Sequence, residues 1–254
     1  MDYKKLQKSI LEDLKKLDND KHFLGAYIFG SAARGEFGKE SDIDVKVLVD
    51  KSDCTHVSHP FIRGVKLDIT FMSYDHIIAV MDKQVAKRER VPMIAESIII
   101  FDKTGKLREL KKKYSKVKAP KYKPADYEGI IFLAYHFTNC IERYLQSDPA
   151  AAFAGMHTNL TNLIEMRYRT VGRWQVSSKR LLKDLRSWDK PFSVLIEKFL
   201  KEADLNKKFK LWLVVKDYVL KPLGGARPVA DLNCDCKSCS IYLKKVGELE
   251  QILT

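Results

Sequence analysis

Three aspartates stand where their spacing allows them to act together. Asp42 and Asp44 lie two residues apart in an alternating apolar run, and Asp68 lies between apolar residues further along the chain. Residues two apart on a strand project from the same face, so this pair presents two carboxylates on one side while Ile43 faces the core. Adjacent carboxylates oppose each other's ionisation unless a hard divalent cation neutralises them. With Asp68 on the next strand, the pattern predicts a three-carboxylate site for two magnesium ions.

A glycine-serine pair precedes these acids by about a dozen residues. Gly30 and Ser31 follow the apolar run of residues 26–29 and open a short helix, so we expect backbone amides to seat phosphate there. Arg34, placed one turn into that helix, is expected to pair with the same phosphates. Ser41 adds a hydroxyl just before the acidic strand. These residues predict a nucleotide-binding site beside the metal site.

The combined pattern resembles the polymerase-beta-like nucleotidyltransferase superfamily. Its signature is an apolar strand, Gly-Ser, a loop, Asp-x-Asp and a later strand aspartate, and the resemblance covers roughly residues 20–110. It implies a small mixed sheet, a two-magnesium site, a nucleoside triphosphate donor, expected to be ATP, and attack on the α-phosphate with pyrophosphate leaving. It also implies that Asp42 and Asp44 bind metal and triphosphate, and that Asp68 shares the catalytic metal and helps activate the acceptor.

Apolar periodicity places these motifs on alternating elements. It predicts helices over residues 2–20, 74–88 and 106–114 and strands over 26–29, 42–49, 65–72 and 97–102. Residues 116–124, with two prolines and no apolar period, indicate a linker. Beyond it only helical stripes recur, near 151–169, 178–186, 192–203, 206–220 and 240–252. We therefore predict an α/β (α+β) catalytic domain over 1–118 and an all-helical domain over 124–254.

The domain order also resembles two-domain antibiotic nucleotidyltransferases, such as the kanamycin and lincosamide enzymes. Residues 169–185 are similar to an arginine-tryptophan-lysine segment in helical domains of some members, although Gly172 stands where an asparagine is expected. By this likeness Arg173, Trp174 and Lys179 are candidates for nucleotide contact, with helix packing and surface charge as the alternative. Glu142 is the candidate general base, preferred over two other glutamates of these helices, Glu128 and Glu165.

Charge and composition restrict the setting. Lys and Arg number 46 against 33 Asp and Glu, a formal net charge of +13, which favours polyanionic partners. Between Lys103 and Lys123, ten basic residues accompany one acid, Glu109, which is typical of a solvated helix face or of a guide for a polyanion. The charged start and the absence of a long apolar run predict a cytoplasmic protein without membrane contact, acting as a monomer or homodimer.

Five cysteines form no regular framework and fit a reducing compartment. Cys234, Cys236 and Cys239 have spacing suited to zinc, but a structural zinc site needs a fourth ligand. Cys54 or the His56 and His59 pair are the candidates for that ligand, and free thiols are the alternative.

Three functions remain open on these patterns. The first is nucleotidyl transfer to a small-molecule hydroxyl, as on an antibiotic, although a cationic aminoglycoside would need an acidic cleft in a basic chain. The second keeps the chemistry but makes the acceptor an RNA end or a protein side chain, as in toxin-like members of the superfamily. The third is a non-catalytic nucleotide- or RNA-binding module, which would not require three clustered acids.

Overall fold

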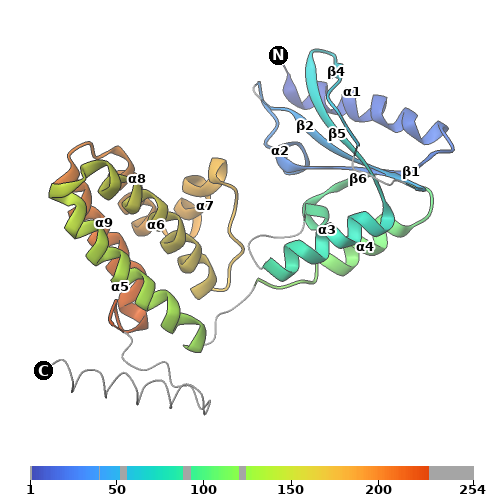
Figure 1. Ribbon diagram of the computed structural model, residues 1–254. Coiled ribbons are helices and arrows are strands. Elements are labelled where there is room, and N and C mark those ends of the chain that lie inside the picture. Colours follow the sequence, from blue (N-terminus) through green and yellow to red (C-terminus); the bar gives the residue numbers. More distant parts are fainter. Residues whose placement is uncertain (1, 40, 52–55, 88–92, 120–123, 229–254) are drawn as a thin grey trace, which may run out of the picture. The chain divides into compact units, whose positions relative to one another are not determined.

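The computed structural model describes residues 2–39, 41–51, 56–87, 93–119 and 124–228, and it divides into two compact units. The first comprises residues 1–120 with 172–176, and the second comprises 121–171 with 177–254. The first unit is built on a mixed sheet and the second is helical within the described residues (Figure 1). The predicted fold class, a mixed-sheet domain followed by a helical one, is confirmed.

The sheet of the first unit has the strand order β3-β5-β2-β1-β6, with β4 paired to β5. Only β2 and β5 run parallel, whereas the pairs β1–β2, β1–β6, β3–β5 and β4–β5 are antiparallel. The bounds are β1 Phe23–Phe29, β2 Ile43–Val49, β3 His56–Ser58, β4 Phe61–Ile62, β5 Val65–Ser73 and β6 Ile98–Asp102. The four predicted strands are present, and β3 and β4 are additional short strands that the sequence pattern did not reveal.

Helices cover both faces of this sheet (Figure 1). One face, which includes Ile43, Val45 and Val47, packs against Ile10 and Leu14 of α1 (Tyr3–Lys15). The opposite face contributes Tyr27, Leu48 and Met72 to a second core with α3 (Tyr74–Lys87) and α4 (Lys106–Tyr114). Because side chains alternate along a strand, each strand supplies both cores.

Polar residues replace apolar ones along part of that second face. On β2 the residues that share the side of Leu48 are Lys46 and Asp44, and on β5 those that share the side of Met72 are Thr70, Asp68 and Lys66. The apolar half of this face is covered by α3 and α4, and the polar half carries every charged residue of the two central strands. This polar half, which we call the open half-face, is where the site must be sought.

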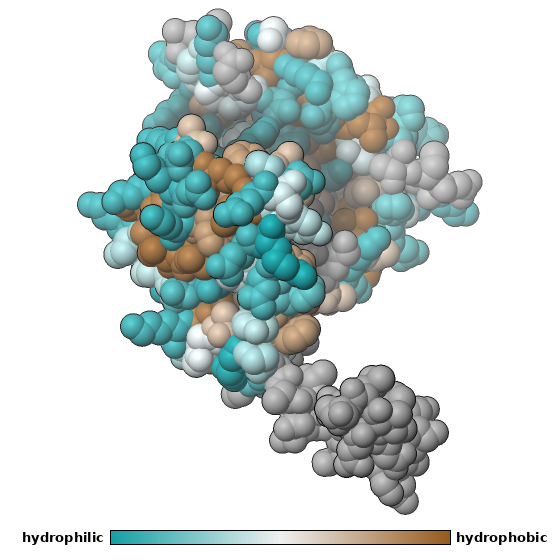
Figure 2. Space-filling model, turned by 60° about the vertical axis from the view of Figure 1, so that its left-hand side comes forward, coloured by the Kyte–Doolittle hydropathy of each residue, from teal (hydrophilic) through white to brown (hydrophobic). Residues whose placement is uncertain are grey.

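The second unit is a bundle of α5 (Pro124–Ser147), α6 (Pro149–Thr170), α7 (Leu181–Trp188), α8 (Lys190–Lys201) and α9 (Leu205–Leu220). The stripes predicted between residues 151 and 220 all form helices, and the stripe near 240–252 lies outside the described residues. Among the described helices, none combines the length and apolarity needed to cross a bilayer. On the face drawn in Figure 2, apolar patches lie among hydrophilic side chains.

Aspartates begin three of these helices. Asp148, Asp189 and Asp204 cap α6, α8 and α9 by accepting a backbone N–H of the first turn. Asp189 differs from the other two because its carboxylate is 5% exposed and also accepts from Arg167 at 2.7 Å and Tyr218 at 2.7 Å. Hydrogen bonding to this ionised acceptor raises the pKa of Tyr218 further, after the larger effect of burial. One side chain therefore joins α6, α8 and α9.

Replacing Asp189 with alanine is expected to lower the free energy of unfolding of the helical unit by about 3 kcal/mol, because a largely buried arginine loses its partner. The matched change Asp148→Ala removes only an exposed cap and should cost about 1 kcal/mol. Urea unfolding followed by far-ultraviolet circular dichroism measures both values. Equal losses in the two variants would contradict the joining role of Asp189.

Candidate active site

Two of the three predicted aspartates lie side by side on adjacent strands. In the parallel pairing of β2 with β5, Asp44 is the register partner of Asp68. Their neighbours Ile43 and Leu67, also register partners, are fully buried on the opposite face. A shift of one residue would expose both apolar side chains and bury both acids, so the hydrophobic core holds the two carboxylates in register.

The sequence pattern had placed Asp42 within the strand. In the structure β2 begins at Ile43, so Asp42 lies directly before the strand. Its charge nevertheless acts on the same group as those of Asp44 and Asp68. The pKa of Lys66 is raised first by its hydrogen bond to Asp68, and the negative charges of Asp42 and Asp44 add to the effect. Lys66 therefore contacts Asp68 directly and senses the charges of the other two acids at longer range.

Gly30 brings the glycine-serine bend against this acid group. It follows Phe29, the register partner of Asp44, and has a positive φ of 73°. A Cβ atom at position 30 would collide with Oδ2 of Asp44 and lie 3.3 Å from its Cγ. Only glycine satisfies both the left-handed backbone and this close approach. The bend and the carboxylate are thus in direct contact, as the sequence motif predicted.

Asp68 is held by two neighbouring side chains, Lys66 and His59. Its Oδ1 accepts from Nζ of Lys66 at 2.8 Å and lies 2.5 Å from Nδ1 of His59. These hydrogen bonds, with Lys66 the larger contributor, lower the pKa of Asp68. A carboxylate with a lowered pKa is a weak base, so it is better suited to holding positive charge than to removing a proton.

The three acids do not form a complete set of metal ligands in the described part of the chain. Among the described residues, no three His, Cys, Asp or Glu side chains converge as metal ligands, because Asp68 is directed at Lys66 and His59. The donor set nevertheless fits magnesium, because it consists of carboxylate oxygens and the charges of all three acids favour the cationic form of Lys66. The residues present are therefore compatible with a divalent cation in the place of that ammonium.

Lys46 completes the open half-face. Its Nζ donates to Oγ1 of Thr70 at 2.8 Å and lies 5.4 Å from the centre of the Phe29 ring, the residue before Gly30. Burial lowers the pKa of Lys46, and the charge of Asp44 opposes this shift. A cationic group is thus positioned between the apolar core and the acid pair, close to the residue that opens the glycine-serine bend.

Sequence reasoning overlooked Lys46, Lys66 and His59 as parts of the site. Two of them carried a usable signal: Lys46 continues the alternation of Asp44, and Lys66 that of Asp68, so each had to share a face with its aspartate. His59 had none, because its contact depends on the chain path through β3 and β4. It had been considered for zinc binding, and the structure places it against Asp68 instead.

The expected phosphate ligands are present but engaged with other groups. Helix α2 covers only Gly30–Ala33, so Arg34 follows the helix and is not one turn into it. The Arg34 guanidinium pairs with Glu36 at 3.0 Å and Glu96 at 3.7 Å. The hydroxyl of Ser41 accepts from the backbone N–H of Gly38 at 3.0 Å and closes the loop before β2.

Other candidates belong to the second unit. Lys179 is exposed in the turn Ser178–Arg180 of the second unit, and Glu142 is exposed on α5, so their roles stay predictions. Glu165 pairs with Arg169, and Glu128 with Arg227 at 3.0 Å. Cys54 and the three C-terminal cysteines, Cys234, Cys236 and Cys239, lie outside the described residues. The zinc hypothesis therefore stays a prediction.

Comparison with known proteins shows what the chain is similar to. A nucleotidyltransferase-like protein from Exiguobacterium sibiricum 255-15 is similar in structure, with 16% identity, 85% of this chain and 73% of that chain covered, and a TM-score of 0.48. No curated protein matches the chain significantly. Residues 12–104 match the family described as polymerase beta, nucleotidyltransferase. The matched segment contains the glycine-serine bend and all three aspartates.

Proposed function

We propose that this protein transfers a nucleoside monophosphate from a nucleoside triphosphate, ATP, to a hydroxyl group and releases pyrophosphate. The observation that carries the proposal is the register pairing of Asp44 with Asp68 beside the Gly30 bend, inside the segment that matches the nucleotidyltransferase family. A non-catalytic binding module is less well supported, because phosphate binding alone gives no reason to collect carboxylates next to the bend.

Magnesium is the cofactor that this donor set implies. Asp42, Asp44 and Asp68 would hold it, after Lys66 gives up its position among the three carboxylates. When bound, the ions would neutralise charge on the triphosphate and favour ionisation of the attacking hydroxyl. The same carboxylates then lose their mutual repulsion, which the lysine offsets in the structure described above.

The chain's own groups divide the remaining tasks. Gly30, without a side chain, admits the phosphates close to the backbone, and Ser31 supplies the next amide. Lys46 stabilises negative charge that develops on the transferred phosphate, from a position fixed by Thr70. Arg34 is a further phosphate ligand once it leaves Glu36 or Glu96. The acceptor oxygen forms its bond to the α-phosphorus as the bond from that phosphorus to the pyrophosphate oxygen breaks.

Two classes of acceptor deserve a test. A small molecule such as an antibiotic follows from the two-domain resemblance. An RNA end is favoured by α4, whose buried side consists of Leu107, Leu110 and Tyr114 and whose exposed side includes Arg108 and Lys112. A helix with a basic exposed side next to an apolar buried side provides a surface that a polyanion can follow.

Changing Asp44 to asparagine is expected to reduce pyrophosphate release from ATP and magnesium by about 10²–10³-fold, because one anionic ligand of the proposed cation is lost. The fold should remain, since the side chain keeps its shape and Ile43 still faces the core. Asp50→Asn, an exposed change just beyond β2, is the matched control. Full activity of Asp44→Asn would remove the basis of the proposed function.

Changing Lys46 to methionine is expected to reduce turnover by about 10- to 100-fold, the range for losing a charge-assisted hydrogen bond, with a smaller effect on ATP affinity. Methionine keeps the apolar contact with Phe29, and exposed Lys51→Met serves as the control. Steady-state pyrophosphate release and the binding of a fluorescent ATP analogue separate the two effects. Normal turnover with lower thermal stability would show that Lys46 is only structural.

The acceptor can be identified by incubating the protein with each labelled triphosphate, magnesium and a cell extract, and by sorting labelled products by size. An RNA acceptor predicts large, ribonuclease-sensitive products and activity that falls steeply with salt, because bound phosphates release counterions. A small neutral acceptor predicts small products and a shallow salt dependence. Label confined to protein would contradict both of these acceptors.

A further inference from the structure

The hairpin of β4 and β5 places an exposed aromatic ring beside the acid pair (Figure 1). Phe61 of β4 is the register partner of Lys66 on β5, and partners in an antiparallel pair project from the same face. Lys66 lies two residues before Asp68 and therefore shares its face. Phe61 thus borders the open half-face, as does His59, two residues earlier, whose ring contacts Asp68.

Core packing does not account for the position of the Phe61 ring. Ile62 and Val65, the other register pair of this hairpin, pack on the α1 side of the sheet and hold the hairpin to the core. Phe61 faces the other way and is 71% exposed, the largest fraction among the exposed large apolar side chains of the described residues. Val57 of β3, on the same face and 45% exposed, extends this apolar edge.

The order of the groups across the strands assigns this edge to the acceptor. Gly30 follows β1, and Asp44 lies on the neighbouring strand β2. Asp68 lies on β5, and Phe61 lies beyond it on β4, so the acid pair separates the glycine-serine bend from the hairpin. In phosphoryl transfer the attacking and leaving oxygens lie roughly in line on opposite sides of the phosphorus. In the proposed reaction, pyrophosphate therefore leaves on the side of the bend, and the attacking hydroxyl approaches from the hairpin.

We propose, on the basis of the proposed function, that Phe61 stacks on the 3′-terminal base of a single-stranded RNA acceptor and thereby places the terminal hydroxyl beside Asp68. Positions 66 and 68 are about 7 Å apart along the strand, which is comparable with the distance from a base to the hydroxyls of its own sugar. The hydroxyl oxygen then bonds to the α-phosphorus, its proton passes to solvent, and pyrophosphate leaves with the electron pair of the broken bond.

The chemistry of the edge favours RNA over a cationic antibiotic. Proteins commonly hold unpaired bases by stacking them on exposed aromatic side chains beside positive charge. Phe61 offers the ring, and its partner Lys66 supplies an ammonium on the same face, in a chain of net charge +13. An aminoglycoside is itself positively charged and has no planar aromatic ring, so it matches neither feature.

The test measures binding of a short single-stranded RNA, labelled at its 5′ end, by fluorescence anisotropy with neither ATP nor metal present. A second RNA of the same sequence lacks only the base of its 3′-terminal nucleotide. The unaltered chain should bind the complete RNA about tenfold more tightly than the abasic one, because one base–aromatic stack is lost. Phe61→Ala should bind both RNAs equally weakly, and Phe61→Trp should restore the difference.

Ile98→Ala is the matched control, because Ile98 is an apolar side chain, 41% exposed, on β6 at the opposite edge of the sheet. This change should leave both affinities intact. In the complete reaction with ATP and magnesium, Phe61→Ala should raise the KM for RNA about tenfold and leave the KM for ATP unchanged. Far-ultraviolet circular dichroism checks that each variant folds.

Absence of RNA binding, a terminal base that makes no difference to the unaltered chain, or a difference that survives Phe61→Ala would overturn the stacking contact. Pyrophosphate release that is lost in Asp44→Asn would then leave the proposed function standing. Conversely, full activity of Asp44→Asn together with a normal dependence on the terminal base would remove the transfer reaction and keep the RNA contact.

Discussion

The parallel pairing of β2 with β5 is the constraint on which the candidate site depends. Ile43 and Leu67 are partners on the buried side, so Asp44 and Asp68 become partners on the other side. Burial of the apolar pair stabilises a register that would be unfavourable for the acids alone, since like charges on adjacent strands repel. Packing of the core thus holds the carboxylates of Asp44 and Asp68 close together on the other face of the two strands, where they repel each other.

Neighbouring polar side chains offset part of this repulsion. Lys66 and His59 hold Asp68, and Lys46 lies on the opposite side of the acid pair along the strands. The hydrogen bonds from Lys66 and His59 lower the pKa of Asp68. A divalent ion would offset the repulsion with greater charge, so Lys66 would compete with such an ion for Asp68.

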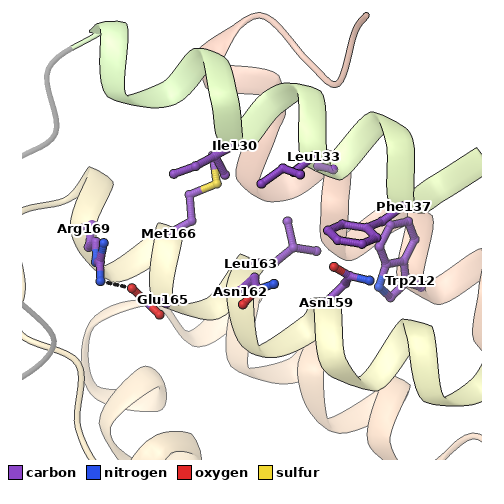
Figure 3. A pocket seen from close by; sticks show the side chains of 11 residues that line it. Ile130, Leu133, Phe137, Asn159, Asn162, Leu163, Glu165, Met166, Arg169 and Trp212 are labelled. Carbon is purple, nitrogen blue, oxygen red and sulfur yellow. Dashed lines mark ion pairs between the residues drawn. The ribbon is translucent and has the colours of Figure 1, made fainter. Parts of the chain in front are cut away.

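In the helical unit, shared polar side chains connect the helices. Its helices are joined through single polar groups such as Asp189, which satisfies a cap, an arginine and a tyrosine at once. Such shared groups fix how helices meet without requiring every gap to be filled by apolar side chains. A cavity between α5, α6 and α9 is one gap that remains (Figure 3).

Local patterns in the sequence were sufficient to predict most elements and the core of the site. Alternation placed Asp44 opposite Ile43, and Gly30 identified the bend, because each depends on neighbours within a few residues. Short β3 and β4 escaped notice, since two- and three-residue strands are too brief to show a period. The tertiary structure alone decided that His59 meets Asp68, that Arg34 pairs with Glu36 and Glu96, and that Trp212 faces a cavity. The contacts of Arg34 with Glu96 and of Trp212 with helices α5 and α6 join residues far apart in the chain, and their energies depend on packing that no local spacing records.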